Sequence, residues 1–521
     1  MVPPIFKSGR GIRRGSDQKR LPITIMIIFL QYANIEIFGL GCMRAFSSGV
    51  LAFVQGAPLI FCGTGLVGHL LLWLMLLQGA SAWLHLAYLQ SATALIMILI
   101  VPYLALRGGK VGRVFIALSV LFSVLALIRL DTPVATLSTA MTRAAFFQAF
   151  LTAVFMLQDA AMRSYSMNQI GLFLISQPIL KQSILTLLGT NLMALMMNLG
   201  SLVMIGTLAR NRESGSPLSS LENSPSVWIT AVSALRGFAA SVTWSPLALP
   251  PVFLTSLYPT VGLGTTMLVG AAFSVVILII SLLFTLGQAA LSYRQDGFPD
   301  VQPRKLPRRP IANLASLLVI IFIAIFVAAG TLDISTSSAV TVIIPVTAML
   351  WMIKAHKGSL RTLLRDRFPS IMHDQVPRQA AQTSVIVSAA FLSPVLVALF
   401  PVDLVSNALA AAQISAPVLL SSIFLAVILL GMVGINPVLS TSLAAAIFPD
   451  PVRYGATPLS MIVILAIGWA LAAEFSPYTG TTTIISRMLG ISAERLVFEK
   501  NGLFLFMSLA ITVGSIFLVV S

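Results

Sequence analysis

The sequence predicts an all-α polytopic membrane protein with two inverted repeats, each containing a re-entrant helical hairpin and a helix broken at a Ser-Pro motif. Three observations predict this fold class: the composition, a motif that recurs after 231 residues, and the spacing of the basic segments. Of the 521 residues, 57% are hydrophobic and only 9% are charged, which is typical of membrane proteins and not of soluble domains. The apolar runs are about 18–25 residues long, the length of membrane-spanning helices.

The recurring motif consists of glycine, an aromatic residue and alanine, followed by an aromatic residue, serine and proline. It runs from Gly237 to Pro246 and again from Gly468 to Pro477, inside two long apolar segments. A proline within a helix removes a backbone donor and frees a carbonyl group. Lipid tolerates this only where protein or a water-filled cavity satisfies the freed groups. Paired interruptions at corresponding positions of two halves indicate the binding site of a transporter.

The basic segments divide the chain into four parts. Lys and Arg collect in short connections, which the positive-inside rule places in the cytoplasm together with the basic N-terminus. Residues 84–290 and 312–521 then contain the same succession in opposite orientations: three spans, a long apolar segment, a broken helix and a closing span. Residues 291–311 form a basic cytoplasmic linker, and residues 1–83 form a basic N-terminus with one or two extra apolar segments.

The long apolar segments, 170–208 and 418–448, begin and end on the same side in this scheme and are interpreted as re-entrant hairpins. We expect the first tip near residues 189–191 and the second at residues 434–437, because Gly, Asn and Pro suit a turn. Two short transmembrane helices joined by a tight loop are the alternative.

Glu474 lies two residues before the second Ser-Pro, deep in an apolar segment, where an ionisable residue indicates function. It could exchange a proton, ligate Na⁺ together with Thr479, or pair with a basic group such as Arg236. Arg236 could instead bind an oxyanion of the solute. A helix that restarts after Pro477 presents free N–H groups to an anion. The other candidates for binding a solute or ion are Ser245, Pro246, Asn436, Pro437, Ser476, Gly480, Thr481, Thr482, Asn198 and Ser201.

Inverted repeats with re-entrant hairpins and helices broken at such points resemble the ion transporter superfamily, which includes divalent anion/sodium symporters, citrate carriers and arsenite permeases. The segments that carry this resemblance most specifically are Ser476–Thr483, Trp244–Pro246 and Gly434–Pro437. Neither expected tip carries the Ser-Asn-Thr of the divalent anion symporters. The resemblance implies movement of a small ion or organic anion with Na⁺ or H⁺, through an elevator-like shift of the hairpin-bearing part.

We therefore expect a secondary active transporter of a bacterial inner membrane that moves a small anionic solute, coupled to H⁺ or Na⁺. A cation/proton antiporter is the nearest alternative, because an antiporter needs only one or two intramembrane acids. A membrane-embedded transferase is more distant, because the loops carry no acid or His cluster. The two cysteines and four His residues show no metal-ligand spacing, so neither enzyme activity nor a cofactor is expected. The expected partners are membrane lipid and the solute, without nucleic acid. A homodimer is compatible with the sequence.

Overall fold

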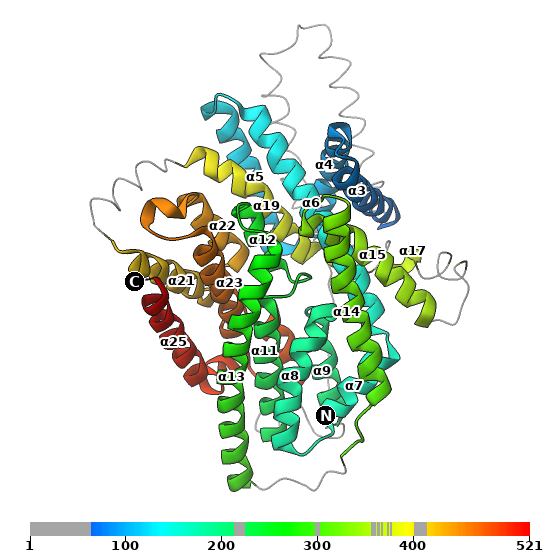
Figure 1. Cartoon of the computed structure of the whole chain (residues 1–521), viewed down its shortest axis with the longest axis vertical. Helices are drawn as coiled ribbons and strands as arrows, with labels where there is room; N and C mark the ends of the chain where they lie inside the picture. Colours follow the sequence, from blue (N-terminus) through cyan, green and yellow to red (C-terminus); the bar gives the residue numbers. More distant parts are fainter. Residues whose placement is uncertain are drawn as a thin grey trace, which may run out of the picture. The chain divides into compact units, whose positions relative to one another are not determined.

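The computed structural model describes residues 64–212, 224–296, 303–355, 361, 365, 368–371, 375, 378–400 and 414–520. In this part of the chain, eleven helices are long and apolar enough to cross a membrane. The protein is therefore an all-α polytopic membrane protein, as predicted, and its long helices pack side by side in a bundle (Figure 1). Of the predicted N-terminal region at 1–83, residues 1–63 lie outside the described residues.

Ten helices lie among the described residues before the basic linker. They are α3 (Thr64–Leu84), α4 (Ala87–Arg107), α5 (Gly109–Arg129), α6 (Pro133–Met162), α7 (Tyr165–Ile175), α8 (Ile179–Met197), α9 (Gly200–Arg212), α11 (Pro225–Val242), α12 (Leu249–Leu257) and α13 (Leu263–Asp296). A proline stands in the first turn of α6, α11 and α12, where a helix needs no N–H donor. These prolines fix where the three helices begin.

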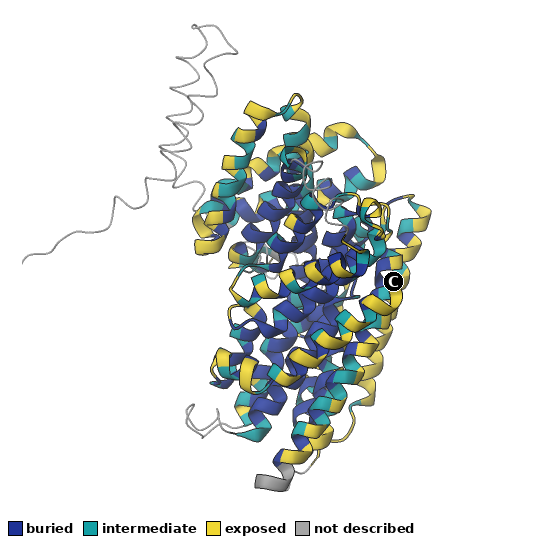
Figure 2. Ribbon diagram, turned by 90° about the vertical axis from the view of Figure 1, so that its left-hand side faces the viewer, coloured by how far each residue is buried: buried dark blue, intermediate teal, exposed yellow. Residues whose placement is uncertain are grey.

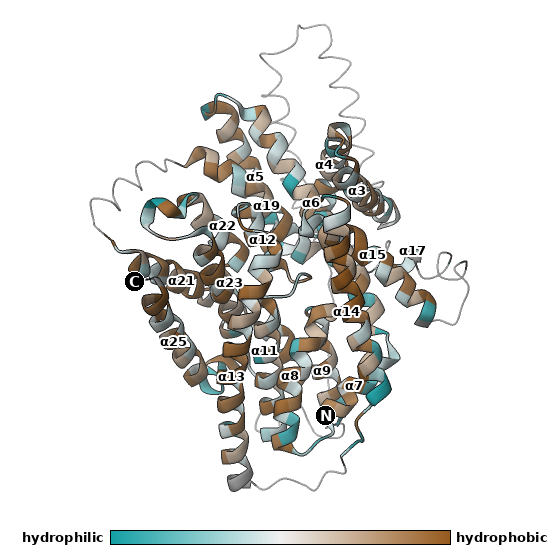
Figure 3. Cartoon of the chain, in the orientation of Figure 1, coloured by the Kyte–Doolittle hydropathy of each residue, from teal (hydrophilic) through white to brown (hydrophobic). Residues whose placement is uncertain are grey.

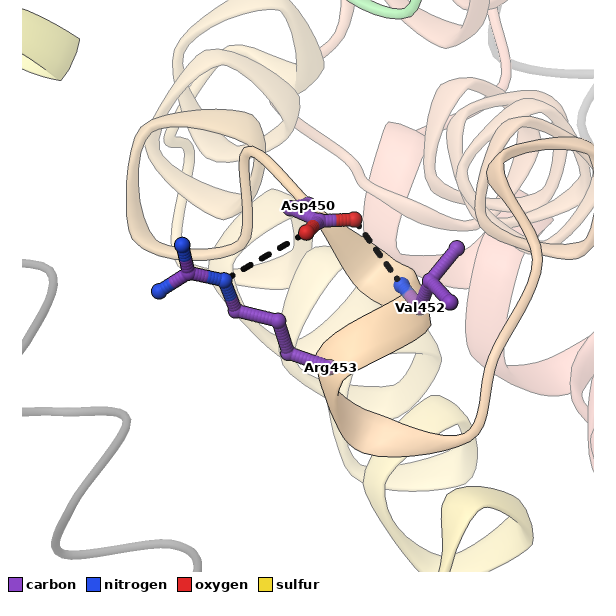
Figure 4. Close-up of polar contacts among 3 residues, drawn as sticks. All are labelled: Asp450, Val452 and Arg453. Carbon is purple, nitrogen blue, oxygen red and sulfur yellow. Dashed lines mark hydrogen bonds and ion pairs between the residues drawn. The ribbon is translucent and has the colours of Figure 1, made fainter.

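The remaining described elements follow the basic linker. They are α14 (Arg308–Thr331), α15 (Thr336–Ala355), α17 (Phe368–Ser370), α19 (Ala380–Leu399), α21 (Ala416–Met432), α22 (Pro437–Ile447), the 3₁₀ turn η3 (Pro451–Tyr454), α23 (Pro458–Phe475), α24 (Gly480–Leu489), the π-helical turn η4 (Arg495–Glu499) and α25 (Gly502–Val520). The side chain of Asp450 begins η3 by accepting from the Val452 N–H at 3.3 Å, and it pairs with Arg453 Nε at 3.3 Å (Figure 4).

The first helical hairpin, α8–α9, turns later than predicted. The expected tip at residues 189–191 lies inside the continuous helix α8, and the turn falls at Asn198, which has a left-handed φ of 46°. Gly189 provides packing space: a Cβ there would lie 2.4 Å from the Leu174 side chain. Asn191 is buried and donates to the Gly237 carbonyl at 3.2 Å. Both residues therefore serve contacts between helices and not a turn.

The second hairpin, α21–α22, turns where the sequence predicts. Gly434 has a φ of 92°, a conformation that favours glycine. Asn436 follows as the N-cap of α22, and its side chain accepts from the Val438 N–H at 2.9 Å. The turn chemistry of glycine, asparagine and proline thus explains this tip completely.

In each hairpin, the first arm packs against the helix that carries the recurring motif. The motif glycine Gly237 of α11 lies so close to α8 that a Cβ would be 2.1 Å from the Leu187 carbonyl oxygen. Similarly, a Cβ on Gly468 of α23 would lie 3.3 Å from the Val427 side chain of α21. The first glycine of the motif is therefore explained by close helix packing in both places.

Burial separates an inner set of helices from an outer one (Figure 2). In α6 and in the α23–α24 segment, 78% of the most apolar window is buried within the protein, compared with 17% in α5 and 22% in α25. The exposed surfaces of the outer helices are nevertheless hydrophobic (Figure 3), which is the pattern expected of helices that face lipid. The interrupted helices thus lie at the centre of the bundle.

Candidate functional site at the interrupted helices

Two helical segments are interrupted at the recurring Ser-Pro motif. α11 ends at Val242 and α12 begins at Leu249, while α23 ends at Phe475 and α24 begins at Gly480. The two predicted interruptions are therefore present in the structure. Each leaves carbonyl groups at the end of one helix and N–H groups at the start of the next without partners in the helix itself.

Both interruptions have the same hydrogen-bond pattern around the motif serines, Ser245 and Ser476. The serine N–H donates to the carbonyl four residues earlier, at 3.1 and 3.2 Å, and the serine carbonyl accepts from the N–H three residues later, at 3.1 and 3.4 Å. The serine hydroxyl accepts from the N–H two residues later, at 3.2 Å in both places. These serines and the prolines that follow them, Pro246 and Pro477, are all buried and shape the two turns.

The first interruption is closed. The Thr243 hydroxyl donates to the Gly270 carbonyl of α13 at 3.1 Å, and a Cβ on Gly270 would be 2.1 Å from the Thr243 carbonyl oxygen. The Trp244 ring stacks on Phe322 of α14, with 6.3 Å between ring centroids. Two consecutive prolines in the first turn of α12 remove N–H donors that would otherwise face the interruption. The chain has therefore little to offer a ligand here.

The second interruption is open on one side. Tyr478 is 67% exposed, although its neighbours Ser476 and Pro477 are buried. No atom lies within 4 Å of the position of a Cβ on Gly480. The turn of the second hairpin adjoins this opening, because a Cβ on Gly434 would contact the Tyr478 ring at 3.6 Å. The N-terminus of α24 thus begins at an exposed surface of the described helices.

Six oxygen atoms lie together at the second interruption. They are the carbonyl oxygens of Ala473, Glu474 and Ser476 and the hydroxyl oxygens of Thr479, Thr481 and Thr482. The Thr479 hydroxyl oxygen lies 2.8 Å from the Ala473 oxygen and 3.0 Å from both the Ser476 carbonyl and the Thr481 hydroxyl. The Thr482 hydroxyl donates to the Glu474 carbonyl at 3.3 Å. We refer to these atoms as the oxygen cluster.

The oxygen cluster has the chemistry of a cation site. Three hydroxyl protons serve six oxygen atoms, so several lone pairs remain for a ligand. Carbonyl oxygens at the end of a half-helix, with nearby hydroxyl groups, are the ligands that transporters use for Na⁺. The predicted residues Thr479, Thr481 and Thr482 are therefore brought together, whereas Gly480 contributes open space. No group of three or more His, Cys, Asp or Glu side chains suited to a metal occurs among the described residues.

The carboxylate of Glu474 points elsewhere, into a chain of buried polar groups. Its Oε1 accepts from Asn501 Nδ2 at 2.9 Å, and Asn501 Oδ1 accepts from Arg236 Nε at 2.9 Å. Arg236 also donates to the Thr285 hydroxyl at 2.8 Å and lies over the Phe504 ring at 4.4 Å. This buried chain connects α23 and α11 through the residue that precedes α25.

All three members of the buried chain are inaccessible: Arg236 is 0% exposed, and Glu474 and Asn501 are each 1% exposed. Oε2 of Glu474 and Nη2 of Arg236 have no hydrogen-bond partner among the described residues. Arg236 therefore does not face the opening at Tyr478. Arg236 and Glu474 were predicted as a possible pair. In the structure Asn501 lies between their side chains and is hydrogen-bonded to both.

The other predicted residues shape the hairpin turns. Asn198 caps the end of α8, and its carbonyl accepts from the Ser201 hydroxyl at 2.8 Å. Asn436 and Pro437 begin α22. Sequence reasoning missed Asn501, although it lies 231 residues after Gly270. Thr243 and Glu474 are also 231 residues apart, and Thr243 contacts Gly270 as Glu474 contacts Asn501. The spacing of the recurring motif could therefore have identified Asn501.

No family model and no curated protein matches the sequence, but solved structures share the fold. The YdaH transporter of Alcanivorax borkumensis, described as having an unusual topology, matches with a TM-score of 0.53 and 13% identity, over 78% of this chain and 98% of that one. MtrF of Neisseria gonorrhoeae, described within a class of antimetabolite efflux pumps, matches with a TM-score of 0.51 and 13% identity, over 79% and 96%. The expected resemblance to membrane carriers is confirmed at the level of the fold.

Proposed function

We propose that the chain is a secondary active transporter that moves a small anionic solute across a bacterial inner membrane, coupled to Na⁺ bound at the oxygen cluster. The oxygen cluster is the observation that carries the proposal, since it combines half-helix carbonyls, hydroxyl groups and access from one side. A membrane-embedded enzyme would require a reactive cluster, and the oxygen cluster offers ligands without a nucleophile or base. The fold shared with two named transport proteins supports the same class.

The proposal includes two inverted repeats, residues 84–290 and 312–521, related through the linker at 291–311. The matching hydrogen bonds around Ser245 and Ser476 support this relation. Only the second repeat would bind the ion, because the first interruption is closed and its following helix begins with prolines. The hairpins would move with the interrupted helices, since each packs tightly against one of them, giving an elevator-like alternation of access.

Coupling to a proton at Glu474 is the alternative within this class. The buried chain of polar groups favours Na⁺ instead, because the Glu474 carboxylate is hydrogen-bonded to Asn501, which in turn binds Arg236, away from the opening at Tyr478. A proton carrier must exchange with water on both sides of the membrane in turn. The oxygen cluster needs no rearrangement of buried charges to exchange its ion.

Equilibrium binding of ²²Na⁺ to the purified full chain tests the proposal. Thr481→Val removes one hydroxyl ligand at nearly constant volume and should weaken Na⁺ binding about tenfold, which corresponds to about 1.4 kcal/mol. Thr255→Val is the matched control, because Thr255 is a buried threonine that bonds its own helix in α12 at 2.8 Å. Equal Na⁺ affinity in the two variants, or no Na⁺ binding by the wild type, would contradict the proposed ion site.

A further inference from the structure

Three exposed cations surround the single residue that joins α4 to α5. Arg107 lies in the last turn of α4, and Lys110 and Arg113 lie in the first two turns of α5. We refer to these three residues as the basic turn. No Asp or Glu occurs in α3, α4, α5 or the adjacent α19. The one acid of the neighbouring α6, Asp159, is buried and paired with Arg163. The described helices around the basic turn therefore leave its positive charge unbalanced.

The basic turn is fixed against α19. The Ser384 hydroxyl donates to the Gly108 carbonyl at 3.2 Å, and Gly112 packs so closely on the same serine that a Cβ would lie 1.9 Å from its hydroxyl oxygen. Arg113 Nε donates back to the Gly109 carbonyl at 3.1 Å, which directs the guanidinium towards the turn. The three cations are thus presented together from a well-packed connection between two helices.

An apolar stripe extends from the basic turn along the exposed face of α5. Val114, Leu121 and Ile128 are 57%, 59% and 72% exposed. They follow Lys110 at intervals of four and then seven residues, so all four residues lie on one face of the helix. At 1.5 Å per residue the stripe is roughly 27 Å long, which is more than one leaflet of a hydrocarbon core about 30 Å thick.

Cations at one end and an apolar stripe below them match the parts of an anionic phospholipid. Lys and Arg side chains donate to phosphate oxygens, and a guanidinium can do so with two parallel bonds. The acyl chains of such a lipid would continue along the stripe. The opposite end of α5 differs, because it carries one cation, Arg129, and an acid follows closely at Asp131. The headgroup of an anionic lipid therefore has a suitable partner at only one end of this helix.

A second copy of the chain is a less suitable occupant of this face. Two copies related by a two-fold axis along the membrane normal present the same patch to each other. Their basic turns would lie at the same depth in one interface, where like charges repel. The positive-inside rule explains why cations lie at this end of α5, but it does not require them to share one well-packed turn above an apolar stripe.

We infer that the basic turn and the apolar stripe bind an anionic phospholipid of the cytoplasmic leaflet. The phosphate group would lie among Arg107, Lys110 and Arg113, and one acyl chain would lie along Val114 and Leu121. Anionic lipids are attracted to basic side chains at the cytoplasmic surface, and each Lys or Arg close to that surface strengthens binding about fivefold.

Photo-labelling of the full chain in phosphatidylcholine nanodiscs tests the inference. The nanodiscs contain a small fraction of phosphatidylglycerol or phosphatidylcholine with a diazirine on the same acyl carbon near the headgroup, and peptide mass spectrometry locates the labelled residues. The phosphatidylglycerol probe should label residues 104–118 at least fivefold more than the phosphatidylcholine probe, and this labelling should saturate as the probe fraction rises. Equal labelling by the two probes, labelling that does not saturate, or labelling of this segment by neither probe would overturn the inference.

Lys110→Gln provides the residue-level test. At a subsaturating fraction of the phosphatidylglycerol probe, it should lower the labelling of residues 104–118 about fivefold. Arg129→Gln is the matched control, because Arg129 is an exposed cation at the other end of the same helix, and it should leave this labelling unchanged. Both variants should melt as the wild type does, since substitutions of exposed side chains have small effects on stability. Unchanged labelling in Lys110→Gln, or the same loss in both variants, would defeat the inference.

Discussion

Replacing Glu474 by Gln should destabilise the protein by leaving the guanidinium of Arg236 without a counter-charge. Both side chains are almost completely buried, at 1% and 0% exposure, and removing one partner of a buried pair costs about 3–5 kcal/mol. Asn501 stands between the two charges, at 2.9 Å from each, which weakens their attraction relative to direct contact. We therefore expect the lower end, about 3 kcal/mol, or a decrease in melting temperature of about 3 °C.

The assay is thermal unfolding of the purified protein in a double-mutant cycle. Arg236→Gln should be destabilising to a similar degree, while the double variant should lie within about 1 kcal/mol of the wild type, because removing both buried charges is nearly neutral. Asp450→Asn, in an exposed pair with 54% exposure of each side chain, is the control and should change stability by less than about 1 kcal/mol. Additive effects of the two buried substitutions would refute the reasoning.

Three further predictions concern packing, the interruptions and the orientation in the membrane. Gly112→Val should lower the melting temperature by overpacking α5 against α19, since a Cβ would lie 1.9 Å from the Ser384 hydroxyl oxygen; wild-type melting would contradict this contact. Pro477→Ala should weaken ²²Na⁺ binding by favouring a continuous helix, whereas Pro246→Ala, in the closed interruption, should leave it unchanged; the same loss in both would contradict the asymmetry. Reporter domains fused to the ends should place Met1 in the cytoplasm and Ser521 outside, and finding both on one side would contradict the inverted repeats.

The sequence was sufficient for the elements whose signal is local. Apolar length predicted the spans. Gly434 and Asn436 marked the second hairpin turn, because a left-handed glycine followed by an N-cap and a proline is fixed by adjacent residues. The first turn was misplaced because the glycine in α8 serves a contact with Leu174 of α7, and a glycine required by packing looks the same in the sequence as one required by a turn.

The candidate site was predicted only where its residues are close together in the sequence. The hydroxyl groups after Pro477 are close together in sequence, and they meet in the oxygen cluster. The buried chain depends on Asn501, Thr285 and Arg236, which come from three separate elements. The residues next to Glu474 in the sequence predict neither the role of Asn501 between the two charges nor the direction in which the Glu474 carboxylate points. The closure of the first interruption likewise depends on a distant ring, that of Phe322.

Uptake of ²²Na⁺ into proteoliposomes tests the central claim, Na⁺-coupled transport by the oxygen cluster, most directly. Proteoliposomes holding the full chain receive external ²²Na⁺ with or without a mixture of small organic anions. The account predicts that the solute mixture accelerates ²²Na⁺ uptake, that this acceleration persists in Thr255→Val and that it is strongly reduced in Thr481→Val. Uptake of ²²Na⁺ that is unaffected by the solute mixture, or an acceleration unaffected by Thr481→Val, would contradict it.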